Sequence, residues 1–169
     1  MSDQLPPTKT VYTIGYGNLG WESLLLRLRQ AGVQRVVDVR SQPYSRHHPE
    51  FGRESLARLC LAAGIAYAYE GDRLGGMPDW PEVQREGKPD RDLIRQDPRF
   101  RRGLMELLMT LETPSALLCG CARPEHCHRG PLLSTELQRL GCRVIHIGLN
   151  GTLRDHESVP LESQASLFS

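Results

Sequence analysis

The chain has 169 residues and a mass of 19.0 kDa, a size that suits one domain. Its 21 basic and 20 acidic residues leave a net charge of +1, which counts against non-specific binding to nucleic acid or to anionic membranes. No apolar run reaches the roughly 18–20 residues that span a bilayer. The first ten residues lack a signal-peptide pattern, so we expect a cytoplasmic protein whose five cysteines are reduced thiols.

Hydrophobic periods alternate along the chain between those of strands and those of helices. Short apolar or β-branched runs predict five strands, at residues 10–14, 35–39, 65–69, 115–119 and 142–147. Apolar residues at helical spacing predict four helices between them, at residues 21–31, 56–63, 98–111 and 132–140. This alternation is typical of an α/β fold. We expect one mostly parallel five-stranded sheet with helices on both faces, a Rossmann-like three-layer arrangement with strand order 3-2-1-4-5.

The α/β domain is expected to cover residues 10–149. Residues 1–9 are expected to be a disordered N-terminal segment. Residues 71–96 are polar and rich in Gly and Pro, which predicts an irregular loop insertion. Residues 150–169 have no apolar period, which predicts a flexible tail.

The carboxyl ends of parallel strands meet at one edge of a sheet, where open α/β sheets bind their ligands. After the second strand, Asp38 and Arg40 lie on the same side of an extended chain, where a carboxylate–guanidinium fork could aim the arginine at an anion. Ser45 and Arg46 can donate to phosphate oxygens. The Gly75-Gly76 turn permits close approach of a ligand to the backbone. An ordinary ion pair and a plain turn are the alternatives.

The densest group of reactive residue types is Cys127, His128 and Arg129. Pro131 is tolerated only in the first turn of a helix, so these residues should lie where the fourth helix begins. Free N–H groups and the helix dipole favour an anion there and lower the pKa of a thiol. We expect Cys119 or Cys127 as a nucleophile, His128 as acid or base, and Arg129 as an anion-binding residue. The alternative is a helix start with a buried cysteine and a surface arginine.

Three cysteines also suggest a metal site. Cys119 and Cys121 flank one glycine and, with Cys127 and the histidine after it, give the spacing Cys-x-Cys-x5-Cys-His. This spacing is not one of the common zinc patterns. Zinc or another soft metal therefore remains an alternative, with Cys119, Cys121 and Cys127 as the candidate ligands. A redox pair of Cys121 and Cys127 is a further alternative.

The sequence resembles the small bacterial and archaeal proteins of the family called domain of unknown function 488, from about residue 11 to residue 148. The resemblance lies in Thr13-Ile14-Gly15-Tyr16-Gly17, Asp38-Val39-Arg40-Ser41 with Pro43 and Ser45, Phe51, Leu74-Gly75-Gly76, Leu117-Leu118-Cys119, Cys127-His128-Arg129 and His146-Ile147. It implies a cytoplasmic α/β protein and assigns no activity. The chain departs from the family at Cys121, where a glutamate is common, and at Gly17, where serine is commoner.

These residues favour an enzyme, a hydrolase or a transferase, that acts on a phosphorylated or otherwise anionic substrate. A nucleotide or a nucleic-acid end would fit that description. The alternative is a non-catalytic nucleotide- or metal-binding module with a cysteine-rich site. A nucleic-acid binder is less favoured because the net charge is near zero. We expect no membrane partner, and the sequence leaves the oligomeric state open.

Overall fold

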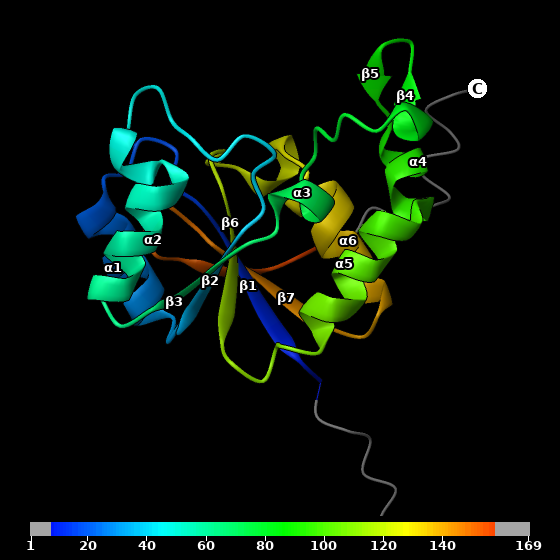
Figure 1. Ribbon diagram of the computed structural model, residues 1–169. Helices are drawn as coiled ribbons and strands as arrows, with labels where there is room; N and C mark the ends of the chain where they lie inside the picture. Colours follow the sequence, from blue (N-terminus) through cyan, green and yellow to red (C-terminus); the bar gives the residue numbers. More distant parts are fainter. Residues whose placement is uncertain (1–7, 158–169) are drawn as a thin grey trace, which may run out of the picture.

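The structure is a computed structural model that describes residues 8–157. Its centre is a six-stranded sheet (Figure 1). In spatial order the strands are β3 (Ala66–Tyr69), β2 (Arg35–Asp38), β6 (Ser115–Cys119), β1 (Thr10–Gly15), β7 (Arg143–Ile147) and β8 (Leu153–Asp155). Neighbouring strands are parallel except for β8, which pairs antiparallel with β7. The predicted mixed α/β fold with a mostly parallel sheet is therefore confirmed.

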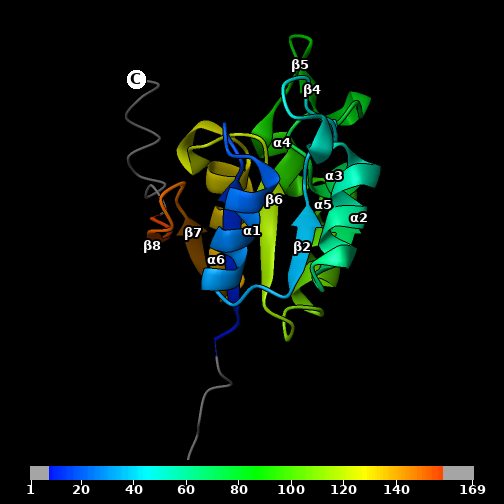
Figure 2. The ribbon, with the colours of Figure 1, turned by 90° about the vertical axis from the view of Figure 1, so that its left-hand side faces the viewer.

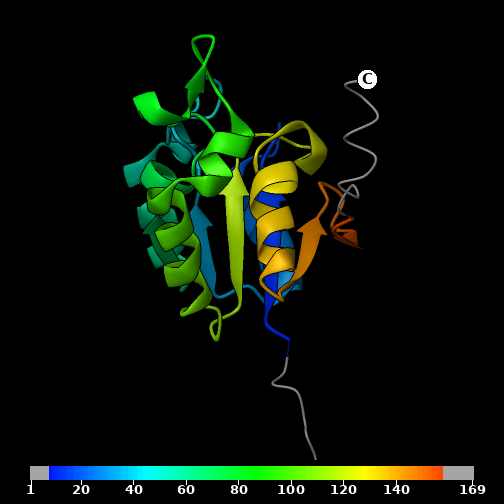
Figure 3. The ribbon, with the colours of Figure 1, turned by 90° about the vertical axis from the view of Figure 1, so that its right-hand side faces the viewer.

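Helices cover both faces of this sheet. Figure 2 shows α1 (Trp21–Gln30) in front of the sheet on the side where α2 (Arg53–Ala62) also lies, and Figure 3 shows α5 (Pro98–Leu108) and α6 (Thr135–Arg139) on the other side. Because side chains alternate along a strand, each strand contributes to two apolar cores. On β2, for example, Val36 joins the core under α1 and α2, whereas Val37 joins the core under α5 and α6.

The strand number and order differ from the prediction. The fourth predicted strand, β6, lies between β2 and β1, so the order of the predicted strands is 3-2-4-1-5 instead of 3-2-1-4-5. All five residues of β6 are buried, as a central strand requires. The first strand is almost as apolar, so hydrophobicity alone could not show which of the two neighbours β2.

The sixth strand comes from the segment that was expected to be a flexible tail. Residues 153–155 form β8, and the segment reaches it through a turn in which Gly151 adopts a φ of 84°. All three residues of β8 are exposed and are held by backbone pairing with β7 and by polar side-chain contacts such as that of Asp155 with Arg143, which explains why the segment shows no apolar period. The remaining tail, residues 158–169, and residues 1–7 of the predicted disordered N-terminus lie outside the described residues.

The expected irregular loop at 71–96 is also more ordered than predicted. It holds α3 (Gly71–Leu74), a 3-10 turn η2 (Pro81–Val83), a hairpin of β4 (Gln84–Arg85) and β5 (Lys88–Pro89), and α4 (Arg91–Gln96). Asp90 caps α4 by accepting a hydrogen bond from the Leu93 N–H. Elements this short leave no readable hydrophobic period, yet Leu74, Val83 and Ile94 are buried in the core.

Two features of the fold matter for the site. The register pairs Gly15 with Cys119 and Thr13 with His146, so the central strands deliver these residues to the same end of the sheet. A 3-10 turn, η3 (Pro124–His126), and a π-helical segment, η4 (Arg129–Ser134), connect β6 to α6 there, whereas another 3-10 turn, η1 (Pro49–Phe51), precedes α2. No helix in residues 8–157 is long and apolar enough to cross a membrane.

Candidate functional site

Three cysteine side chains converge at the carboxyl end of β6. Cys119 is the last residue of that strand, Cys121 lies in the loop after it, and Cys127 directly precedes His128 and η4. Their three sulfur atoms all lie within 4.8 Å of one another, and the Sγ atoms of Cys119 and Cys127 are 3.2 Å apart. Cys119 and Cys127 are buried, whereas Cys121 is exposed. We call these three residues the thiol cluster.

Backbone contacts with β1 hold the loop of the thiol cluster in place. The N–H groups of Tyr16 and Gly17 donate to the carbonyls of Cys119 and Gly120, over 3.2 and 3.1 Å, which extends the pairing of β1 with β6 beyond the strand. A Cβ atom at Gly15 would lie 1.6 Å from the carbonyl oxygen of Cys121. Glycine is therefore required at this position, because the loop backbone lies directly against the strand.

The helical segment after the cluster is wound as a π-helix. The N–H of Leu133 donates to the carbonyl of His128, five residues earlier, over 2.9 Å. Side-chain hydroxyls support the same winding, since Ser134 Oγ donates to the Arg129 carbonyl and Thr135 Oγ1 to the Gly130 carbonyl. The start of this segment is where the sequence predicted a helix to begin: Arg129 is its first residue, His128 is the N-cap, and Cys127 lies just before it in an extended conformation.

Arg129 lies behind the thiol cluster and has no exposed surface. Its Nη1 donates to Thr13 Oγ1 over 2.7 Å, and its Nη2 donates to the carbonyls of Cys121 and Ala122 over 3.0 and 3.1 Å. None of the carboxylates in residues 8–157 forms an ion pair with it. A buried cation needs a compensating anion, and here the thiols are the acidic groups on which its charge acts.

The three thiols differ in acidity. The Cys119 thiol, together with Cys127 and the Arg129 charge, lowers the pKa of Cys121 to about 6, although partial burial opposes this. The pKa of Cys127 is lowered by Cys119 and by the N–H of Arg129. The pKa of Cys119 is raised because it donates to the other two sulfurs and is buried. At neutral pH the cluster therefore holds a thiolate, with Cys119 as a protonated neighbour.

His128 turns away from this thiolate. Its Nε2 lies 3.0 Å from the carbonyl oxygen of Val39, and burial lowers its pKa to about 4, so the ring is neutral at pH 7. The two candidate glycines contact the protein itself. A Cβ at Gly76 would lie 2.7 Å from the His128 ring, and one at Gly75 would lie 2.1 Å from Ser41 Oγ. Both glycines therefore make room for neighbouring side chains.

Asp38 and Arg40 form the predicted fork. Arg40 Nε and Nη2 donate to the two Asp38 oxygens over 2.8 and 2.7 Å, and both residues are buried. The Tyr67 hydroxyl also donates to Asp38, over 2.6 Å. The remaining Nη1 of Arg40 faces the Tyr16 hydroxyl at 3.4 Å. The fork of Arg40 is thus engaged by Asp38 and not turned toward an outside ligand.

The loop after β2 holds the other two predicted anion-binding residues. Ser45 Oγ accepts a hydrogen bond from the His48 N–H over 3.1 Å. Arg46 is exposed, and no carboxylate in the described part of the chain pairs with it. Of these two residues, Arg46 has the freer polar group.

Tyr16 connects the Asp38–Arg40 pair with the thiol cluster. Its hydroxyl lies beside Arg40, and a Cβ at Gly120 would lie 3.0 Å from the same oxygen. Sequence reasoning missed this role of Tyr16, and it also missed Thr13, which contacts both Arg129 and His146. The register of β1 with β7 places Thr13 opposite His146. This pairing could not be predicted from the sequence, because it depends on the order of the strands in the sheet.

A hollow of about 240 Å³ opens beside the loop of the thiol cluster. Its lining includes Ala122 and Arg123, the two residues after Cys121, and Arg154 from β8. Arg154 pairs with Glu125 over 3.3 Å, whereas Arg123 is exposed and unpaired within residues 8–157. An anion that entered this hollow would meet a free guanidinium.

Fold and site together define an α/β domain with a thiol cluster at the carboxyl edge of its sheet. The chain belongs to the family described as Domain of unknown function DUF488, whose model matches residues 20–135. This confirms the family resemblance seen in the sequence. The matched segment contains Asp38, Arg40, the three cysteines and Arg129, and it leaves out β1 and β7. Neither the comparison with curated proteins nor that with solved structures found a match.

Proposed function

We propose that this protein is a thiol-dependent enzyme, a hydrolase or a transferase, that acts on a phosphorylated or otherwise anionic substrate. One observation carries the proposal. An exposed thiol, that of Cys121, lies against two buried thiols and in front of a buried arginine that has no carboxylate partner in the described chain. Such a setting stabilises a thiolate where a substrate can reach it. Reduced thiols also favour the cytoplasm as its location.

The proposed chemistry uses two sulfur atoms with opposite acidity. The Cys121 thiolate attacks the phosphorus or acyl carbon of the substrate, and a bond from sulfur to that atom forms. The bond to the leaving oxygen breaks, and that oxygen takes the proton of Cys119. Water or an acceptor alcohol then attacks the covalent intermediate, returns a proton to Cys119 and releases Cys121 as a thiolate. Groups whose environments separate their pKa values are suited to such divided roles.

These roles refine the expectation from sequence. Cys121 replaces Cys119 or Cys127 as the nucleophile, because the latter two are buried. His128 is neutral and bonded to Val39, so it supports the fold of the segment and supplies no proton from an imidazolium. Arg129 contributes positive charge from within the protein, whereas the charge of Arg40 is paired with Asp38. Direct contact with the anion falls to the exposed Arg123 and Arg46.

The position of the site supports an anionic small molecule as the substrate. Rossmann-like sheets typically bind their ligands at the carboxyl edge. We propose that this chain resembles them in this respect and binds its substrate at the same edge. The hollow beside the loop that follows Cys121 is lined by residues that include Arg123 and Arg154. A nucleotide or a terminal phosphate would meet positive charge there without the broad basic surface that duplex binding requires.

The test is turnover of activated esters by reduced, chelator-treated protein. We expect p-nitrophenyl phosphate or p-nitrophenyl acetate to give an initial burst of p-nitrophenol, and peptide mass spectrometry to find the adduct on Cys121. The Cys121→Ser variant should lose the burst. The matched control, Cys142→Ser, changes a buried cysteine outside the thiol cluster and should keep it. A full burst in Cys121→Ser would refute the proposal.

A metal-binding module is the second candidate, because all three sulfurs lie within 4.8 Å of one another. Thiolates prefer soft ions such as Zn²⁺, Cd²⁺ or Cu⁺. Titration of the reduced protein with Cd²⁺ would reveal this function as a thiolate-to-metal absorption band that saturates at one ion per chain. Tight binding of this kind, combined with no burst in the ester assay, would favour the module over the enzyme.

A further inference from the structure

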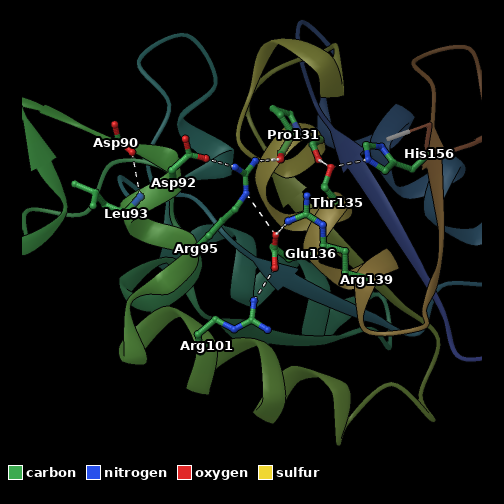
Figure 4. Close-up of polar contacts among 11 residues, drawn as sticks. Asp90, Asp92, Leu93, Arg95, Arg101, Pro131, Thr135, Glu136, Arg139 and His156 are labelled. Atoms are coloured by element: carbon green, nitrogen blue, oxygen red, sulfur yellow. Dashed lines mark hydrogen bonds and ion pairs between the residues drawn. The ribbon is translucent and has the colours of Figure 1, made fainter. Parts of the chain in front are cut away.

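The buried guanidinium of Arg129 begins a chain of hydrogen bonds that leads away from the thiol cluster. Arg129 Nη1 donates to Thr13 Oγ1 over 2.7 Å, and Thr13 Oγ1 lies 2.5 Å from His146 Nδ1. His146 Nε2 lies 2.9 Å from His156 Nδ1, and His156 Nε2 lies 3.1 Å from Thr135 Oγ1. Figure 4 shows the last of these contacts. The chain thus connects β1, β7 and α6 behind the site.

One direction of donation gives every group along these contacts a partner. A guanidinium has no acceptor, so Thr13 Oγ1 must accept from Arg129 and has its single hydrogen left for His146 Nδ1. His146 then carries its own hydrogen on Nε2 and donates it to His156. This requires a neutral His146, and burial, with the positive charge of Arg129 nearby, lowers its pKa to about 3. In this arrangement the hydrogen bond from Arg129 to Thr13 sets the tautomers of both histidines.

The second Nη of the same guanidinium holds the nucleophile loop. Arg129 Nη2 donates to the carbonyls of Cys121 and Ala122, and the first of these carbonyls lies directly against Gly15. The loop backbone is therefore fixed between β1 and one planar group. Because a guanidinium is rigid, the hydrogen bond that Thr13 accepts at one end sets the direction in which Arg129 donates at the other.

We infer that Thr13 and His146 are positioning residues for Cys121. Thr13, itself oriented by His146, fixes the Arg129 guanidinium, and the guanidinium fixes both the backbone of Cys121 and the positive charge behind its sulfur. The inference rests on the proposed role of Cys121 as the nucleophile. Neither strand that carries the two positioning residues lies within the segment matched by the family model, so the family match does not assign them this role.

Other groups also act on the Cys121 sulfur: Cys119 from β6, Cys127 from the start of η4, and His126 from η3. All of these stay in place when only the Thr13 hydroxyl is removed. A change in the reactivity of Cys121 in such a variant therefore reports on the Arg129 guanidinium.

The experiment measures the rate at which iodoacetamide labels Cys121 in reduced, chelator-treated, full-length protein between pH 5 and pH 9. Thr13→Val keeps the shape of a strand residue and removes the hydroxyl. We expect an apparent pKa about half a unit higher, so that Cys121 is labelled roughly threefold more slowly at pH 5 and at a nearly unchanged rate above pH 7. Thr13→Ser restores the hydroxyl and should recover the wild-type profile. Ser115→Ala removes another buried hydroxyl, bonded to the Thr113 carbonyl, and should change nothing.

His146→Leu is a second variant, with the same direction of change expected. Wild-type labelling profiles in folded Thr13→Val and folded His146→Leu would overturn the inference. Slow labelling in both, with recovery in Thr13→Ser, supports it. The proposed function is tested separately, by the burst assay and by whether wild-type Cys121 reacts faster than an ordinary thiol. A failure of the proposed function can therefore be distinguished from a failure of the positioning inference.

Discussion

Two buried charged groups on one continuous helical segment, Arg129 in η4 and Glu136 in α6, are compensated in different ways. At the start of η4, Arg129 is a buried cation with thiols as its acidic neighbours. Seven residues later, Glu136 is a buried carboxylate surrounded by three arginines (Figure 4). Arg101 and Arg139 bind its two oxygens over 2.6 and 2.5 Å, and Arg95 Nε lies 3.4 Å from it.

The difference teaches which of the two regions is suited to chemistry. The Glu136 region joins three helices through ion pairs, since its carboxylate pairs with Arg95 of α4, Arg101 of α5 and Arg139 of α6. A thiol next to a buried cation is largely ionised at neutral pH, where an ordinary thiol is mostly protonated, and the thiolate can react with a proton, a metal or a substrate. One region is therefore expected to determine stability, and the other reactivity.

The largest effect is expected from Gly15→Ala. The new Cβ would lie 1.6 Å from the Cys121 carbonyl oxygen, so the loop must move away from β1. We expect labelling of Cys121 to slow by about tenfold and the free energy of unfolding to fall by roughly 2 kcal/mol. Gly20→Ala is the matched control, because a Cβ there meets nothing within 4 Å. Rapid labelling of Cys121 in Gly15→Ala would show that the loop position is not critical.

Glu136→Gln addresses the other region. The change leaves three arginines facing a neutral amide, and we expect urea denaturation to show a loss of about 2 kcal/mol, reduced from the value for fully buried pairs because Arg101 and Arg139 are partly exposed. The labelling rate of Cys121 should be unchanged. If Glu136→Gln instead kept the wild-type free energy of unfolding and slowed the labelling of Cys121, the Glu136 region would determine reactivity and not stability.

The pH dependence of labelling sharpens the comparison further. Because the pKa of Cys121 is about 6 and not the ordinary 9, its labelling rate should rise between pH 5 and pH 7 and then level off. The folded state binds fewer protons than the unfolded chain in this range, so the thiolate adds stability that is complete above pH 9 and is lost as the pH falls through 6. Continued acceleration up to pH 9 would contradict a stabilised thiolate.

The smallest effect is expected from Arg123→Ala. Removing one exposed guanidinium from the rim of the hollow should raise the KM for an anionic ester by about two- to fivefold, with kcat little changed. Arg102→Ala, on α5, removes another exposed and unpaired arginine of the described chain and serves as the control. Equal effects from both variants would mean that overall charge, and not the hollow, attracts the anion.

The elements were largely predictable from the sequence, and so was the position of the Cys127–Arg129 segment. Pro131 restricts that segment to the start of a helix, and the structure places Arg129 as the first residue of η4, with Cys127 and His128 just before it. The order of β1 and β6 was not predictable, because both are apolar enough to be central. The edge strand β8 was invisible to pattern analysis, since it pairs through its backbone and buries none of its residues.

Within the site, the sequence could supply the residue types but not their exposure. Nothing in the pattern distinguishes the exposed Cys121 from the buried Cys119, because that difference depends on how the loop folds onto Gly15. The burial of Arg129 was equally hidden, since a charged residue gives no hydrophobic signal. Thr13 and His146 became readable only once β1 and β7 were known to be neighbours.

The π-helical winding of η4 has a geometric consequence for the evolution of this site. A π turn contains one residue more than an α turn, so it rotates the residues before the turn about the helix axis relative to the residues after it. Deleting one residue between 130 and 134 would let the segment continue α6 as a regular α-helix, while rotating the cysteine side by roughly 100° about the axis. The direction of the thiols can therefore change without a change in the core under α6. A single-residue deletion would be enough to turn the thiols while the packing of α6 is kept.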